Sequence, residues 1–294
     1  MSAVWRVLKS AVRGYIANES LTRGAAISFY AVTSLTPVLL IVVSVAGIAF
    51  GNDVVREGLI GEIGGVLGQE SGQLVKSMLA KSSDPKTGTS ATVFGIVMLL
   101  VTASGVFGEM QSALNATWQA EAPDEPFFSL IRSRATSLGL VGALGFLLMV
   151  SLAVSTALSG LADYLGGRNV LAPIILSIIN TVVSVGLFTA LFAAIYKVLP
   201  DTPIAWRDVR TGALLTALMF TTGKSLIGWY LGTTATSSGS GAAGALLVIL
   251  LWTYYSAQIF LFGSEVTKAI ADARSDNTKA ATLPKTPRQM RSTR

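Results

Sequence analysis

The stretch GAAISFYAVTSLTPVLLIVVSVAGIAFGN, residues 24–52, contains no Asp, Glu, Lys or Arg. A helix crosses a hydrocarbon core about 30 Å thick in roughly 20 residues, because each residue rises about 1.5 Å. Residues 24–52 are therefore long enough to span a bilayer with some tilt.

Further apolar stretches of the same kind follow. Residues 88–108, 135–162, 169–196 and 243–264 are also free of charged residues, and residues 211–232 contain a single charge, Lys224. Each is long enough for a transmembrane helix. The sequence thus predicts an all-α, polytopic membrane protein with six spans. Since six is even, both termini lie on the same side.

The composition supports this class and excludes several others. Apolar residues make up 51% of the chain and charged residues 13%, whereas about a quarter of the residues in a soluble domain are charged. The chain has no Cys and no His, which excludes zinc sites, haem ligation and catalytic triads that need these side chains. We expect no metal, no cofactor and no enzymatic activity.

The basic residues indicate the orientation in the membrane. With both termini in the cytoplasm, 16 of the 22 Lys and Arg residues lie in inner segments. We expect them to contact anionic inner-leaflet headgroups, and their place at helix ends argues against nucleic-acid binding. The basic tail 273–294 is predicted to be disordered, after one membrane domain over residues 1–272.

The longest predicted outer connection, residues 53–87, has its own helical pattern. Val55, Leu59, Ile63 and Leu67 recur at helical spacing among polar residues. We predict one or two amphipathic helices that cap the bundle or lie in the headgroup layer, with a binding lid as the alternative.

Polar residues gather in the predicted cytoplasmic ends of three spans. In the first span they include Tyr30 and Thr33, before Pro37, which is expected to kink the helix. Gln258 and Glu265 share one face of the sixth span.

The second span ends with Glu109, and together these residues suggest a water-accessible vestibule open to the cytoplasm. The alternative is that Glu109 and Glu265 are interfacial carboxylates paired with Arg23 or Lys268.

Three polar features lie elsewhere in the predicted spans. Small residues recur every four positions between Ala135 and Ser159 and favour close helix packing. Asn180 lies near the middle of the fourth span, where it either bonds to another helix or contacts a substrate. Lys224 either snorkels towards the outer interface near Trp229 or is a buried functional cation that needs an anionic partner.

Four segments carry a family resemblance: RGAAISFYAVTSLTPVLLIV (23–42), FGEMQSALNATW (107–118), LPDTPIAWRDVRTGALL (199–215) and GAAGALLVILLWTYYSAQIFLFGSEV (241–266). Together they resemble the YihY/virulence factor BrkB family of bacterial inner-membrane proteins, formerly labelled ribonuclease BN-like. Where that family often reads Gly-Ala-Glu, this chain has Gly263-Ser264-Glu265. The resemblance implies a six-helix inner-membrane protein with cytoplasmic termini, and it implies no settled activity. The absence of His argues against ribonuclease chemistry at a zinc site.

Two functional hypotheses follow. The first is a transporter or flippase-like permease for an anionic or amphiphilic solute. The second is a non-transporting membrane scaffold for lipid or envelope assembly, and homo-oligomerisation is open under either. The substrate-binding candidates are Lys224, Asn180, Gln258, Glu265, Glu109, Tyr30 and Thr33.

Overall fold

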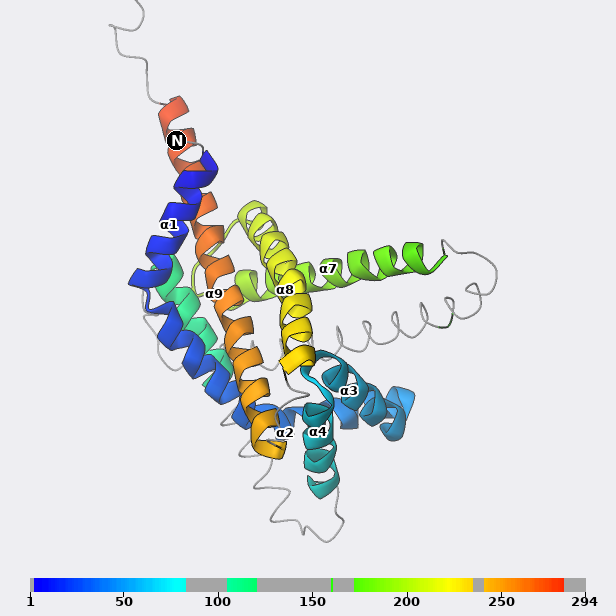
Figure 1. The fold of residues 1–294 in the computed structure, drawn as a ribbon. Coiled ribbons are helices and arrows are strands. Elements are labelled where there is room, and N and C mark those ends of the chain that lie inside the picture. Colours follow the sequence, from blue (N-terminus) through cyan, green and yellow to red (C-terminus); the bar gives the residue numbers. More distant parts are fainter. Residues whose placement is uncertain (1–2, 83–104, 121–159, 161–171, 235–240, 283–294) are drawn as a thin grey trace, which may run out of the picture.

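The computed structural model describes residues 3–82, 105–120, 160, 172–234 and 241–282. The elements in these ranges are all helices, with no strand, which confirms the predicted all-α class. Figure 1 shows their arrangement. They are α1 (Ala3–Ala17), α2 (Ser20–Phe50), α3 (Asn52–Leu67), α4 (Gln69–Ser82), a helix over residues 105–118, α7 (Ala172–Val198), α8 (Trp206–Thr234) and α9 (Gly241–Thr282).

Four of the predicted spans coincide with described helices. The stretches 24–52, 169–196, 211–232 and 243–264 correspond to α2, α7, α8 and α9. By length and composition, Ile175–Val198 of α7 and Ala243–Ser275 of α9 are long and apolar enough to cross a membrane. The stretch 135–162, its small-residue stripe and most of 88–108 lie outside the described residues.

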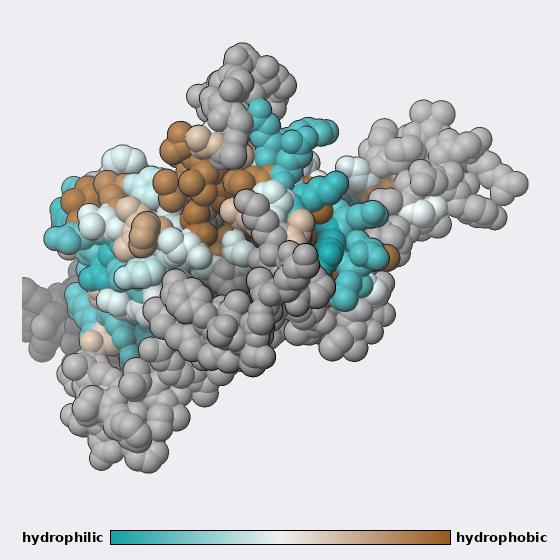
Figure 2. Space-filling view, turned by 90° about the horizontal axis from the view of Figure 1, so that it is seen from below, coloured by the Kyte–Doolittle hydropathy of each residue, from teal (hydrophilic) through white to brown (hydrophobic). Residues whose placement is uncertain are grey.

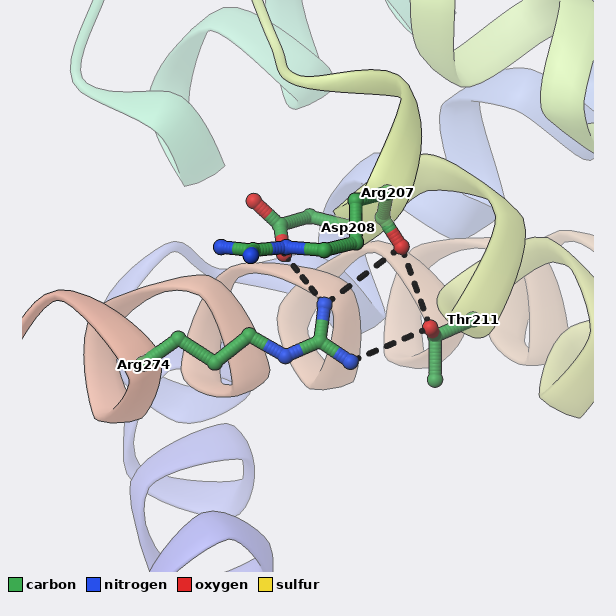
Figure 3. Close-up of polar contacts among 4 residues, drawn as sticks. All are labelled: Arg207, Asp208, Thr211 and Arg274. Atoms are coloured by element: carbon green, nitrogen blue, oxygen red, sulfur yellow. Dashed lines mark hydrogen bonds and ion pairs between the residues drawn. The ribbon is translucent and has the colours of Figure 1, made fainter. Parts of the chain in front are cut away.

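The last helix is longer than predicted. It continues to Thr282, so residues 273–282 are helical where the sequence predicted a disordered tail. One cause is visible in Figure 3: Arg274 Nη1 donates to Asp208 Oδ1 of α8 at 2.5 Å, and Nη2 donates to Thr211 Oγ1 at 3.4 Å. This junction joins the end of α9 to the first turn of α8. Residues 283–294 lie outside the described part of the chain.

The amphipathic helices predicted within residues 53–87 are confirmed as α3 and α4. Gly51 and Gly68 separate them from α2 and from each other, with φ angles of 86° and 90° that favour glycine. Val55 and Val75 are buried against Leu39 of α2. Seen from the α4 end, the surface carries hydrophobic residues beside hydrophilic ones (Figure 2).

The main core lies where α7, α8, α9 and residues 105–118 meet. Tyr196 is completely buried there, and its hydroxyl donates to the Phe260 carbonyl at 2.6 Å. Close contacts between α8 and α9 surround it: a Cβ on Gly263 would lie 2.0 Å from Thr216 Oγ1, and a Cβ on Gly212 would lie 1.7 Å from Thr267 Oγ1. Only glycine fits at these two positions.

The sequence analysis missed α1 altogether. This helix packs along α9, with Ala11 buried against Val266 and Ala269 (Figure 1). It ends at Ala17, and Glu19, with φ of 53°, separates it from α2. As a result, α1 covers the part of α9 around Glu265.

Candidate functional site

A buried carboxylate lies where α1, residues 105–118 and α9 come together. Glu265 is only 4% exposed. Its Oε1 accepts hydrogen bonds from Asn18 Nδ2 at 2.7 Å and from Thr117 Oγ1 at 2.9 Å. Its Oε2 lies against Gly14 of α1, where a Cβ would be 2.2 Å away. Three separate parts of the chain therefore enclose this side chain.

The side chains that donate hydrogen bonds to the Glu265 carboxylate, Asn18 and Thr117, are neutral. No Lys or Arg in the described ranges forms an ion pair with it. Lys268, its predicted partner, instead contacts Asp272 at 3.2 Å. The predicted pairing of Glu265 with Lys268 is therefore wrong, because Lys268 pairs with Asp272 and the carboxylate of Glu265 accepts from Asn18 and Thr117.

Gln258 lies about two turns before this carboxylate on α9. Its Oε1 accepts a hydrogen bond from the Tyr15 hydroxyl, and its Nε2 donates to the Leu21 carbonyl at 3.3 Å. A Cβ on Gly24 would lie 2.2 Å from Nε2, so the amide rests directly on α2. We call Tyr15, Asn18, Thr117, Gln258 and Glu265 the Glu265 cluster.

Tyr15 acts as a donor in this cluster. Burial raises the pKa of its hydroxyl above the ordinary value of 10.0, and repulsion between the ionised forms of Tyr15 and Tyr254 raises the pKa further. The hydroxyl therefore keeps its proton at neutral pH and can donate to Gln258.

Glu109 pairs with Arg23, as one alternative predicted. Arg23 Nη1 lies 3.7 Å from Glu109 Oε1 and donates to Ser112 Oγ at 2.9 Å. Arg23 Nε also donates to the Asn18 carbonyl at 3.0 Å. Glu109 is thus linked to the Glu265 cluster through Arg23 and Asn18.

A water-accessible vestibule stays a prediction. Gln258 and Glu265 come from α9 and Glu109 from the helix over residues 105–118. Glu265 is not open to solvent, since Gly14 of α1, a helix that the sequence analysis missed, lies against it, whereas Glu109 is 27% exposed.

The two candidates of the first span make different kinds of contact. Tyr30 packs against Gly105, where a Cβ would be 2.6 Å from the ring. Thr33 Oγ1 is exposed and donates to the carbonyls of Phe29 and Tyr30, both at 2.9 Å. The kink at Pro37 stays a prediction, within a helix that runs unbroken over Ser20–Phe50.

The structure does not bring Asn180 to the other candidates. Its side chain is exposed on α7, next to the exposed Ile179 and Val182. Both predicted roles, a bond to another helix and a substrate contact, stay predictions.

Lys224 has a carboxylate partner from α3. Its Nζ lies 3.6 Å from Glu62 Oε1 of α3, and the two side chains are 39% and 67% exposed. The cation is therefore half-exposed and paired. We expected an anionic partner if Lys224 were a buried cation, but the sequence did not indicate that Glu62 of α3 would be that partner.

We expect this pair to contribute little stability. Exposed ion pairs contribute about 0–1 kcal/mol. In a double-mutant cycle of Lys224→Met and Glu62→Gln, the coupling in the free energy of unfolding should stay below about 1 kcal/mol. Glu57→Gln, at an exposed position on the same helix, is the control. A larger coupling would show that apolar surroundings strengthen the pair.

Three members of the Glu265 cluster were missed in the sequence: Tyr15, Asn18 and Thr117. Their signal was weak, because each is a single polar residue far from Glu265 along the chain. The helical spacing of Val7, Ala11 and Tyr15 could have revealed α1 as an element. In the described ranges, no group of three or more His, Cys, Asp or Glu residues could hold a metal ion.

Comparison with known proteins gives a family match over nearly the whole chain. The model of the family "Virulence factor BrkB" matches residues 11–289. No solved structure matches the chain.

Several curated relatives are similar. A UPF0761 membrane protein of Alcanivorax borkumensis is 29% identical over 63% of this chain and 42% of its own length. Protein MS0032 of Mannheimia succiniciproducens, also a UPF0761 membrane protein, is 24% identical over 70% of this chain and 68% of its own. The putative ribonuclease-like protein YfkH of Bacillus subtilis is 24% identical over 88% of this chain and 93% of its own. Against some relatives, such as that of A. borkumensis, the match spans less than half of the relative's length.

Proposed function

The chain belongs to the virulence factor BrkB family of membrane proteins, and from that premise we propose that it is a permease, or a flippase-like carrier, for an anionic or amphiphilic solute. We propose six spans, an inner-membrane location and cytoplasmic termini. The protein would act as a carrier rather than as an enzyme.

The observation that carries the proposal is the buried charge of Glu265. An ionisable side chain within an apolar helix is costly and is, by default, a functional candidate. Glu265 is 4% exposed and is compensated by the neutral donors Asn18 and Thr117 rather than by a cation. Such a carboxylate is suited to bind and release a proton or a small cation during transport.

The other candidates have proposed roles at the two ends of the route. Glu109, held by Arg23, is a second proton or cation site at the inner mouth. Lys224 contacts the anionic group of the solute in exchange for Glu62. Tyr15 and Gln258 hold α1 over the inner mouth, so α1 has to move for the solute to pass.

Flux measurements test this proposal. The purified chain is reconstituted in vesicles, and two probes are followed: flipping of a fluorescent phosphatidylglycerol and efflux of radiolabelled chloride. We expect the protein to accelerate one of them and Glu265→Gln to abolish that acceleration. Glu70→Gln, at an exposed carboxylate of α4, should leave it unchanged. If neither probe moves faster than in empty vesicles, or if Glu265→Gln has full flux, the proposal fails.

The alternative is a non-transporting membrane scaffold. On that hypothesis the pair of Lys224 with Glu62 is only a surface contact between α8 and α3. A scaffold predicts no acceleration of either probe by the wild-type chain.

A further inference from the structure

The helix α1 has a buried face and an exposed apolar face. Ala11 on the first face is completely buried against α9. Trp5, Leu8, Val12 and Ile16 are exposed by 54%, 42%, 43% and 70%, although all four are apolar. Their spacing of three, four and four residues puts them in one stripe along the helix.

This stripe has the features of an interaction surface. Its side chains line one hollow on the molecule, together with Lys9 and Arg13. A contiguous exposed apolar patch of this kind marks an interaction site.

The positive charge of α1 indicates an anionic partner. The helix contains Arg6, Lys9 and Arg13 and no Asp or Glu. An amphipathic helix with Trp and Leu on one side and Lys and Arg beside them is suited to the boundary between anionic headgroups and acyl chains.

The helix α1 also lies directly before the first predicted span. After Ala17, a break at Glu19 leads directly into α2, the first predicted span. At the same end of α1, Tyr15 contacts the ring of Phe262 in α9.

We propose that the exposed face of α1 binds the anionic lipid surface of the membrane, with Trp5, Leu8, Val12 and Ile16 in the interfacial layer and Lys9 and Arg13 on lipid phosphates. A second copy of the chain fits this face less well. In a symmetric dimer the face would meet itself, which brings the like charges of both helices together. The inference does not depend on whether the chain transports a solute.

The absence of Cys makes a direct test simple, because each introduced Cys is a unique labelling site. Spin labels are attached to Leu8→Cys and Val12→Cys, with Ser10→Cys as the matched control, since Ser10 is exposed but lies off the stripe. The full-length protein is placed in nanodiscs of phosphatidylcholine with or without phosphatidylglycerol. Collisions of each label with oxygen, which partitions into lipid, and with a water-soluble nickel chelate are then measured.

With phosphatidylglycerol present, we expect the labels at positions 8 and 12 to show a several-fold higher ratio of oxygen to nickel collisions than the label at position 10. Removing the anionic lipid, or introducing Lys9→Gln with Arg13→Gln, should reduce this difference. The inference is overturned if all three labels are equally accessible to nickel in both lipids. It is also overturned if the labels at positions 8 and 12 couple to those of a second copy.

Discussion

Replacing Gly212 with alanine is expected to destabilise the protein by about 1–3 kcal/mol, the cost of forcing an extra methyl group into a packed core. A Cβ at this position would lie 1.7 Å from Thr267 Oγ1 and 2.6 Å from Thr267 Cβ. Thr267 is completely buried, so it has no free space to move into. The helices α8 and α9 must therefore separate. The midpoint of thermal unfolding in detergent measures the loss.

The same reasoning applies one turn further along the two helices. Gly263 of α9 faces Thr216 of α8, just as Gly212 faces Thr267. At each of these two positions a Gly of one helix therefore faces a Thr of the other. Small residues at such contacts let helix backbones approach closely. Gly263→Ala should have an effect of similar size.

A control on α7 should change stability in the opposite direction. Gly186 is exposed, and a Cβ there would meet nothing within 4 Å. Alanine is favoured over glycine in a helix by roughly 1 kcal/mol, so Gly186→Ala should leave the protein as stable or slightly more stable. Adding Thr267→Gly to Gly212→Ala should recover part of the lost stability. If Gly212→Ala and Gly186→Ala behave alike, the close contact of α8 and α9 does not determine stability.

Much of the helical framework could be predicted from the sequence. Charge-free stretches mark α2, α7 and α9, and a stretch with the single charge Lys224 marks α8, because a bilayer sets a minimum length for an apolar helix. The period of Val55, Leu59 and Ile63 predicted α3, and Arg23 was correctly named as a partner of Glu109. These features depend on residues that are close in sequence or, for Arg23 and Glu109, on two opposite charges at the predicted ends of neighbouring spans.

The parts that could not be predicted depend on contacts between distant segments. Asn18 is 247 positions from Glu265, and nothing local in either segment indicates that they meet. The Gly–Thr contacts of α8 with α9 likewise become visible only when the two helices are placed side by side. Helix α1 was hidden for another reason: its Arg and Lys residues were assigned to a cytoplasmic segment, and its helical spacing was overlooked.

The second large effect is expected at Glu265, where alanine and glutamine should behave differently. Glu265→Ala removes the acceptor for Asn18 Nδ2, which is part-buried, and for Thr117 Oγ1, which is buried, and leaves both donors without this partner. A buried unpaired donor costs about 1–3 kcal/mol, so the two together would cost about 2–6 kcal/mol in the free energy of unfolding, and we expect the lower half of that range because Asn18 is only part-buried. Glu265→Gln keeps an oxygen acceptor at the same position.

The free energy of unfolding of the glutamine variant should therefore lie within about 1 kcal/mol of the wild-type value, since removing a buried charge offsets the weaker hydrogen bonds. Glu109→Ala is the control, because Glu109 is 27% exposed and its pair with Arg23 spans 3.7 Å. Glu109→Ala should lower the free energy of unfolding by less than Glu265→Ala does. If Glu265→Ala is as stable as wild type, the contacts with Asn18 and Thr117 do not hold α1 in place.

Stability and flux together separate the two roles that a buried carboxylate can have. A carboxylate whose purpose is to hold helices together should be replaceable by glutamine, which preserves the acceptor for Asn18 and Thr117. A carboxylate that binds a proton or a cation should not, because glutamine cannot exchange its charge state. A glutamine variant that is folded and stable but has lost flux assigns the charge of Glu265 to transport. A glutamine variant that keeps both stability and flux would mean that residue 265 serves only as a hydrogen-bond acceptor for Asn18 and Thr117, and that its charge is not needed for transport.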